Sequence, residues 1–173
     1  MNRLIFLVIL AFLFSFQIFS QENMIFMSYD LKGNLFELDN YAKEKKAKYL
    51  VVDFFSIICE PCKKAMPELE KFYLKSKEKG IEVVVVAIPS QKSAGKEEKK
   101  QVKTYFSEKA KVSFPVMYDI FYSVAYQYGV AIRKKDDAEI SVPQIFLLDS
   151  RGNLLKKSDN YKEILKEIEK IKK

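Results

Sequence analysis

The Cys-Glu-Pro-Cys loop at residues 59–62 contains both cysteines of the chain. An apolar, β-prone segment, residues 49–55, precedes it, and a run rich in Lys, Glu, Leu and Met follows it as far as Gly80. A thiolate at a helix N-terminus faces free backbone N–H groups and the positive end of the helix dipole, which favours the thiolate form. Two intervening residues let the second cysteine attack a mixed disulfide formed by the first. The pattern therefore predicts a site for thiol–disulfide exchange.

Cysteine and histidine usage excludes several other kinds of site. The pair Cys59 and Cys62 would be a poor structural staple, because the loop that it closes is tiny. A tetrahedral metal site needs four ligands, and the chain supplies two sulfurs and no imidazole. The lack of histidine also excludes Cys-His and Ser-His hydrolases. We expect no metal and no cofactor other than the redox-active Cys59–Cys62 pair itself.

Residues 1–20 have the pattern of a secretory signal peptide. Arg3 is followed by an apolar run, residues 4–16, which is short for a membrane-spanning helix, and then by Ile-Phe-Ser as a cleavage site. An uncleaved membrane anchor is the alternative, because Ile-Phe-Ser matches a cleavage site only in part. We predict one domain, residues 21–173, in an exported protein that is periplasmic or otherwise extracytoplasmic, and tethered if residues 1–20 are retained.

The formal net charge of +7 raises the question of an anionic partner such as nucleic acid. Lysines and glutamates are interleaved through the chain, without a basic stripe studded with aromatic residues. We interpret the charge as solvated surface. No nucleic-acid partner is expected, and the protein is predicted to be a monomer.

The order of predicted elements describes a mixed sheet with helices on both faces. A turn at residues 32–34 joins two β-prone segments into an N-terminal hairpin. A loop or a single helical turn is expected at 40–48, and a charged loop at 131–139. Further strands are expected at 49–55, 81–88, 142–149 and 154–157, a short strand or extended link at 114–118, and helices at about 61–79, around 102–106, at 119–128 and from about 159 onward.

The cysteine pair stands among motifs that resemble those of the thioredoxin superfamily. Cys-Glu-Pro-Cys is a loop found in ResA-like proteins. Asp53 lies six residues before Cys59, where thioredoxins carry a buried aspartate. Pro67 matches their helix-kinking proline, and Val142-Pro143 stands where the family keeps a cis-proline facing the cysteines.

The resemblance is closest to the exported TlpA/ResA-like branch, because residues 114–119, Phe-Pro-Val-Met-Tyr-Asp, look like a segment of TlpA-like proteins. It covers nearly all of residues 21–173. It implies a thioredoxin-like three-layer α/β/α sandwich with a central mixed sheet and an N-terminal hairpin. It also implies a thiol–disulfide oxidoreductase that reduces disulfides of exported proteins such as apocytochrome c, with a membrane electron donor of the DsbD/CcdA type.

The chain departs from the family pattern in three places. Ile58 stands where the family usually has tryptophan, and Ala65 stands where many ResA-like proteins carry glutamate. Residues 131–139 lengthen the approach to the cis-proline. We interpret this stretch as a tolerated surface insertion, with a substrate-selecting lip as the alternative.

Within this resemblance each site residue has an expected role. Cys59 is the nucleophile and Cys62 the resolving thiol. Asp53 accepts the proton of Cys62, because burial raises the pKa of a carboxylate; a carboxylate at a strand edge, bonded to a lysine, is the alternative. A cis Pro143 presents the backbone of Val142 to an extended substrate, and the alternative is an ordinary trans proline at a strand start.

Glu60 and Pro61 are predicted to tune the reduction potential. Pro61 has no N–H to stabilise the thiolate, and Glu60 places negative charge beside it, so the disulfide is expected to be less oxidising. This favours a reductant or an isomerase-like protein. Three alternatives stay open: a thioredoxin-fold peroxidase, although Ser56 stands where a Thr-x-x-Cys site has threonine; a copper-handling protein; and a redox-inert binding module.

Overall fold

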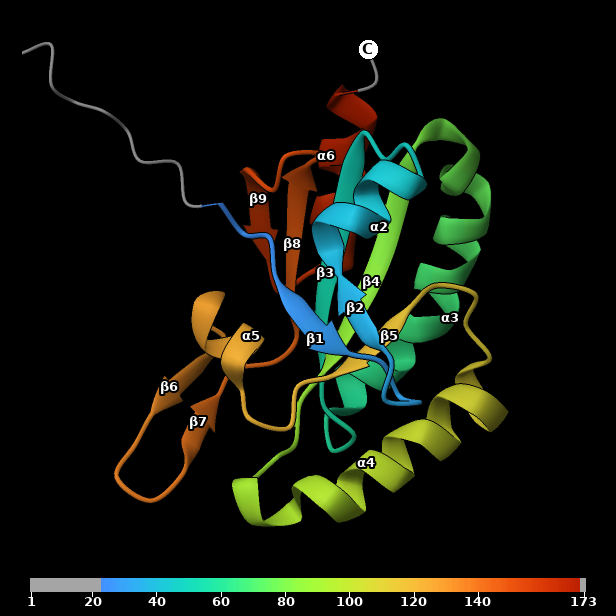
Figure 1. Ribbon diagram of the computed structural model, residues 1–173. Coiled ribbons are helices and arrows are strands. Elements are labelled where there is room, and N and C mark those ends of the chain that lie inside the picture. Colours follow the sequence, from blue (N-terminus) through green and yellow to red (C-terminus); the bar gives the residue numbers. More distant parts are fainter. Residues whose placement is uncertain (1–22, 172–173) are drawn as a thin grey trace, which may run out of the picture.

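The computed structural model describes residues 23–171, and the predicted signal peptide at residues 1–20 lies outside this range. Its centre is a five-stranded sheet in the order β5-β4-β3-β8-β9 (Figure 1). The parallel strands are β3 (Tyr49–Phe55), β4 (Ile81–Ala87) and β5 (Val116–Tyr118). Strand β8 (Gln144–Asp149) pairs antiparallel with both β3 and β9 (Leu154–Ser158). The expected mixed sheet is confirmed.

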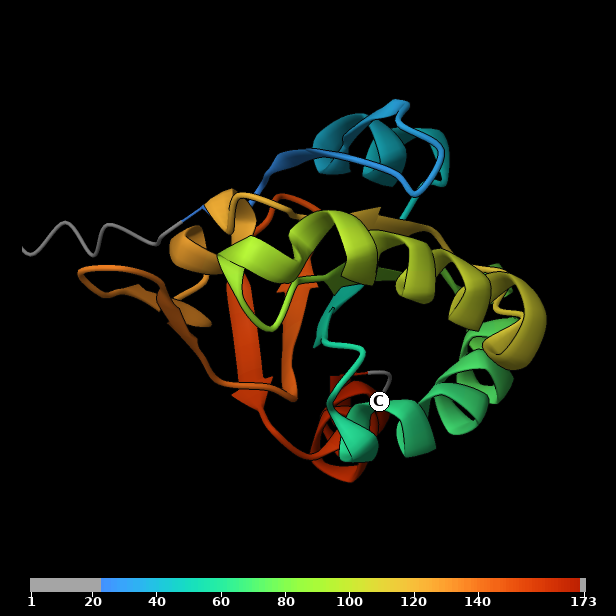
Figure 2. The same cartoon turned by 90° about the horizontal axis from the view of Figure 1, so that it is seen from below.

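Helices and two hairpins surround this sheet (Figures 1 and 2). The helices are α2 (Leu38–Glu44), α3 (Glu60–Ser76), α4 (Gly95–Thr104), α5 (Ser123–Gln127) and α6 (Tyr161–Ile171). The hairpins are β1 (Met27–Tyr29) with β2 (Leu35–Glu37), and β6 (Ala131–Arg133) with β7 (Ala138–Ile140). A π-helical turn, residues 105–110, continues α4. The predicted N-terminal hairpin is therefore present.

The central strands are apolar on both faces because each face is covered. Alternation along β3 sends Val52 and Phe54 into one core, which also contains buried residues of α2 and α5. Val51 and Phe55 enter the other core, with buried residues of α3, α4 and α6. The result is the predicted three-layer α/β/α sandwich, with the cysteines in the core of the second face.

Helix α3 follows from the pattern of its sequence. Met66, Leu69 and Tyr73 recur at helical spacing and are buried against the sheet. The helix continues through Pro67. A 3₁₀ turn follows it and ends at Gly80, whose φ of 77° lies in the left-handed region that commonly ends helices. Helix α3 therefore lies along the face of the sheet that carries Val51 and Phe55, with its N-terminus at the carboxyl end of β3.

Three local predictions need correction. The stretch 40–48, expected as a loop or a single helical turn, instead continues a seven-residue helix, α2, in which the buried Leu38 and Ala42 lie one turn apart. The charged stretch 131–139 is largely the β6–β7 hairpin, whose strands are too short to show an alternating pattern. The helix expected at 119–128 begins only at Ser123, although Asp119 does accept hydrogen bonds from the backbone N–H groups of Ser123 and Ala125.

Replacing Gly152 with alanine is expected to lower the free energy of unfolding by about 2–4 kcal/mol. Gly152 has a φ of 84°, and a Cβ there would lie 2.7 Å from both Asn23 Oδ1 and Ile25 Cγ1. Gly33 is the matched control, because its φ of 94° carries the same backbone cost while no atom lies within 4 Å of its Cβ position. Urea denaturation should show a loss of only about 1 kcal/mol for Gly33→Ala. Equal losses would contradict the steric argument.

Candidate active site

The two cysteines lie at the junction of β3 and α3. Cys59 is the N-cap residue of α3, and Cys62 lies in its first turn. They form a disulfide, and the backbone N–H of Cys62 donates to Sγ of Cys59 at 3.2 Å. Cys59 is 8% exposed and Cys62 is 0% exposed, so the first sulfur is the more accessible one. The arrangement can exchange disulfides through Cys59, with Cys62 held behind it.

The Val142–Pro143 peptide bond is cis, as expected. Phe54, near the end of β3, pairs with Gln144, the first residue of β8. Pro143 therefore lies just beyond this pair, at the end of the sheet where the chain leaves β3 for the cysteine loop. Val142 is partly buried and packs against the core that contains both cysteines. The fold thus brings the proline and the cysteine loop to the same end of the sheet.

Asp53 is completely buried in the middle of the central strand. It has the same parity along β3 as Val51 and Phe55, so its side chain faces the core that contains the cysteines. Burial raises the pKa of Asp53 to about 7, against a smaller opposing effect of a hydrogen bond from Tyr161. The alternative of a carboxylate bonded to a lysine at a strand edge is wrong.

Tyr161 is a residue that the sequence prediction missed. Its hydroxyl donates to Oδ2 of Asp53, whereas Oδ1 has no hydrogen-bond partner among the described residues. Burial and the neighbouring Asp53 carboxylate raise the pKa of Tyr161 above its ordinary value, so the hydroxyl keeps its proton. One signal was available: Tyr161 lies three residues before Ile164 and seven before Ile168, on the inner face of α6.

The substitution Tyr161→Phe is expected to raise the pKa of Asp53 above 7, because it removes the hydrogen bond that favours the carboxylate. The pH midpoint of the step in which Cys62 resolves a mixed disulfide should rise with it, measured by rapid quenching from pH 5 to 9. Tyr105→Phe is the control, since the Tyr105 hydroxyl donates to the carbonyl oxygen of Lys63 instead. An unchanged midpoint in Tyr161→Phe would show that Asp53 does not govern this step.

Glu60 and Pro61 occupy the first turn of α3 between the cysteines. The exposed Glu60 carboxylate forms an ion pair with Lys63, and this contact keeps the pKa of Glu60 below its usual value. The negative charge beside Cys59 is therefore partly balanced by a lysine that the loop sequence alone does not include. Pro61 removes one N–H from this turn, which leaves the N–H of Cys62 as the donor to Sγ of Cys59.

The surface around the cysteine loop is partly apolar. Ile58, which stands in the position of the usual tryptophan, is 64% exposed directly before Cys59. A groove of about 560 Å³ lies on the side of α4, and its walls include Ile57, Lys63 and Tyr105.

Within residues 23–171, no helix combines the length and the apolar character needed to cross a membrane. In that same range, no group of three or more His, Cys, Asp and Glu side chains is placed to hold a metal ion.

Comparison with known proteins agrees with this geometry. The family model described as Redoxin matches residues 18–171. The thiol-disulfide oxidoreductase ResA of Bacillus cereus (strain ATCC 10987 / NRS 248) is 30% identical over 184 residues, covering 96% of this chain and 94% of that protein. ResA of Bacillus thuringiensis subsp. konkukian (strain 97-27) is 31% identical over 144 residues, covering 82% of this chain and 71% of its own.

Solved structures show the same fold. The thioredoxin domain of a thiol-disulfide oxidoreductase from Bacteroides vulgatus matches with a TM-score of 0.62 and 25% identity, covering 85% of this chain and 92% of that one. A thiol-disulfide oxidoreductase from Bacteroides fragilis matches with a TM-score of 0.65 over 85% of this chain and 96% of its own, and its 17% identity supports the fold alone. With a cysteine pair at the start of α3 and relatives of this kind along nearly its whole length, the chain belongs to the redoxin family, as a TlpA/ResA-like thiol–disulfide oxidoreductase of the thioredoxin superfamily.

Proposed function

We propose that this oxidoreductase works as a reductant of disulfides in exported proteins, with apocytochrome c as one substrate of this kind. The groups around Cys59 support this direction of electron transfer, from the dithiol to the substrate. Among the described residues one backbone N–H, from Cys62, reaches its sulfur, while Pro61 supplies none and Glu60 adds a negative charge that Lys63 balances only in part. Weak stabilisation of the thiolate makes the dithiol less stable relative to the disulfide, so the pair gives up electrons more readily.

The proposed reaction has two exchange steps. The thiolate of Cys59 attacks one sulfur of the substrate disulfide, forms a mixed disulfide and expels the other substrate sulfur as a thiolate. Cys62 then attacks Sγ of Cys59 while its proton passes to Asp53, and the first substrate sulfur leaves. Two electrons pass to the substrate, whose sulfurs take up protons, and the enzyme is left with the Cys59–Cys62 disulfide.

The role of Asp53 rests on its burial and on its pKa of about 7, which lets the carboxylate accept a proton near neutral pH. Its Oδ1 atom has no hydrogen-bond donor among the described residues and so retains a free lone pair. Val142 and Pro143 present the backbone against which an extended substrate pairs beside Cys59. The redox-active cysteine pair needs no further cofactor in this scheme.

The cycle also requires a donor that reduces the Cys59–Cys62 disulfide again. A membrane dithiol donor of the DsbD/CcdA type would fill this role for a protein located outside the cytoplasm. Residues 1–20 would then act as a signal peptide or as a tether that holds the domain near its donor.

The equilibrium reduction potential of the Cys59–Cys62 pair tests this proposal. We expect a value near that of thioredoxin, about −270 mV, in glutathione or dithiothreitol buffers, together with reduction of a model protein disulfide. Glu60→Gln is the matched variant, because it removes the charge beside Cys59 and should make the potential less negative. A value near that of DsbA, about −120 mV, would mean that the protein is an oxidase.

A further inference from the structure

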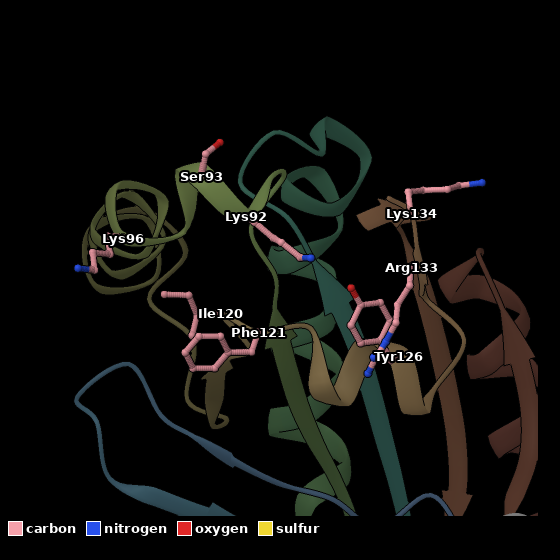
Figure 3. A pocket seen from close by; sticks show the side chains of 8 residues that line it. All are labelled: Lys92, Ser93, Lys96, Ile120, Phe121, Tyr126, Arg133 and Lys134. Atoms are coloured by element: carbon pink, nitrogen blue, oxygen red, sulfur yellow. The ribbon is translucent and has the colours of Figure 1, made fainter. Parts of the chain in front are cut away.

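A cavity of about 670 Å³, here called the cationic pocket, lies between the start of α4, the segment after β5, α5 and the β6–β7 hairpin (Figure 3). Four cations contribute to its walls: Lys92, Lys96, Arg133 and Lys134. No acidic side chain lines it among the described residues, and its apolar wall includes Phe121, which is 81% exposed. Lysines and glutamates are interleaved along most of the chain, whereas here four positive side chains lie around one cavity.

The positive charges in the cationic pocket are only partly balanced. Lys134 forms an ion pair with Glu139 at 2.9 Å and points away from the hollow, whereas Lys92 extends into it (Figure 3). The guanidinium of Arg133 lies over the ring of Tyr126, 4.7 Å from its centroid. Within residues 23–171, no carboxylate forms an ion pair with Lys92, Lys96 or Arg133.

One carboxylate near the cationic pocket is already engaged. Asp137 accepts hydrogen bonds from the backbone N–H groups of Lys92 and Ala138, at 3.1 and 2.8 Å. These contacts join the start of α4 to the β6–β7 hairpin, so they hold the two cationic walls together. Asp137 also interacts electrostatically with the charge of Lys92, and among the described residues it forms no hydrogen bond or ion pair with the guanidinium of Arg133.

The position of the cationic pocket relates it to the dithiol. Strands β3, β4 and β5 are parallel, and the chain leaves their carboxyl ends for the cysteine loop, for the segment before α4 and for Phe121, respectively. Figure 1 shows the carboxyl end of β3, the start of α4 and the β6–β7 hairpin toward the same end of the sheet. Strand β7 then leads through Ser141 directly into Val142-Pro143. The pocket and the proposed substrate-pairing segment thus share one end of the fold and one stretch of chain.

We propose that the cationic pocket binds an acidic segment of the disulfide-bonded protein substrate, and so selects substrates by the charge that flanks their cysteines. This inference rests on the proposed function and adds a substrate class to it. Lys92 and Arg133 attract carboxylates, and the exposed ring of Phe121 packs against the apolar parts of the same chain. The β6–β7 hairpin is then the substrate-selecting lip, and not a neutral insertion.

Two disulfide-linked peptides of equal length test the proposal, one with glutamates and one with glutamines on either side of the cysteine. Hydroxyethyl disulfide serves as a small uncharged substrate that reports on the basal reaction. For the wild-type protein at low salt, kcat/KM should be higher for the glutamate peptide, through a lower KM, and the preference should shrink at high salt. In the double variant Lys92→Gln/Arg133→Gln, the ratio of kcat/KM between the two peptides should fall about five- to tenfold.

The control variant Lys48→Gln/Lys79→Gln removes the same charge from exposed positions at the opposite end of β3 and β4. It should keep the wild-type preference for the glutamate peptide and the wild-type rate with hydroxyethyl disulfide.

A wild-type protein that reduces hydroxyethyl disulfide but treats both peptides alike would overturn the cationic-pocket proposal alone. If hydroxyethyl disulfide is not reduced at all, the proposed function itself is wrong. Tighter binding of wild type than of the double variant to phosphatidylglycerol vesicles, without peptide discrimination, would assign the pocket to lipid and also overturn the proposal.

Discussion

Substitution of Cys62 by serine is expected to stop the reaction after its first exchange step and to leave the protein joined to its substrate. Cys59 keeps its position as N-cap of α3 and can still attack a disulfide. A serine hydroxyl cannot resolve the mixed disulfide, so turnover should fall to the background rate. Non-reducing electrophoresis and intact mass spectrometry should show one substrate chain attached through Cys59, released by dithiothreitol.

The substitution Cys59→Ser is the matched control, because it removes the more accessible sulfur and keeps the buried one. We expect neither turnover nor a stable adduct from this variant. An adduct formed by Cys59→Ser and absent from Cys62→Ser would reverse the order of attack. That outcome would also remove the reason for a proton acceptor beside Cys62.

Replacing Asp53 with asparagine is expected to stabilise the folded protein above neutral pH by up to about 4 kcal/mol. Burial raises the pKa of Asp53 from 3.8 to about 7. Between these two values the folded protein holds a proton that the unfolded chain releases, so the free energy of unfolding falls by about 1.4 kcal/mol for each unit of rising pH. Asparagine needs no ionisation, so the gain should be largest at pH 8 and small at pH 4.

The same Asp53→Asn variant should resolve mixed disulfides more slowly, because the proton of Cys62 loses its proposed acceptor. Urea denaturation from pH 4 to 8 and single-turnover kinetics measure the two effects separately. Asp119→Asn is a useful comparison: this carboxylate is also buried with a raised pKa, but it accepts N–H bonds at the start of α5. Its loss should destabilise the protein without changing the resolving step. A wild-type stability that does not vary between pH 4 and 7 would contradict the argument for Asp53.

Much of the fold could be predicted because local pattern and structure agree. The strands 49–55 and 81–87 are nearly continuous apolar runs, as burial on both faces requires. Helix α3 shows a helical repeat of apolar residues, and the 3₁₀ turn that follows it ends at Gly80. The failures concern short elements. Helix α2 is only seven residues long and the strands β6 and β7 are three residues each, too short for a repeat to be recognised.

The amino-acid sequence is sufficient to predict the reactive groups of this protein: two cysteines at redox spacing, the strand and helix around them, and a proline at the position of the cis bond. The side chains that surround these groups depend on tertiary packing. Tyr161 is hydrogen-bonded to Asp53, which lies 108 positions earlier in the sequence, and the cationic pocket is lined by side chains from four separate segments. A local pattern reports which face of an element is apolar, whereas packing between distant elements decides which polar groups meet there. The hydrogen-bond partner of a buried carboxylate and the charge of a pocket therefore follow from packing between distant elements, and not from the local sequence pattern.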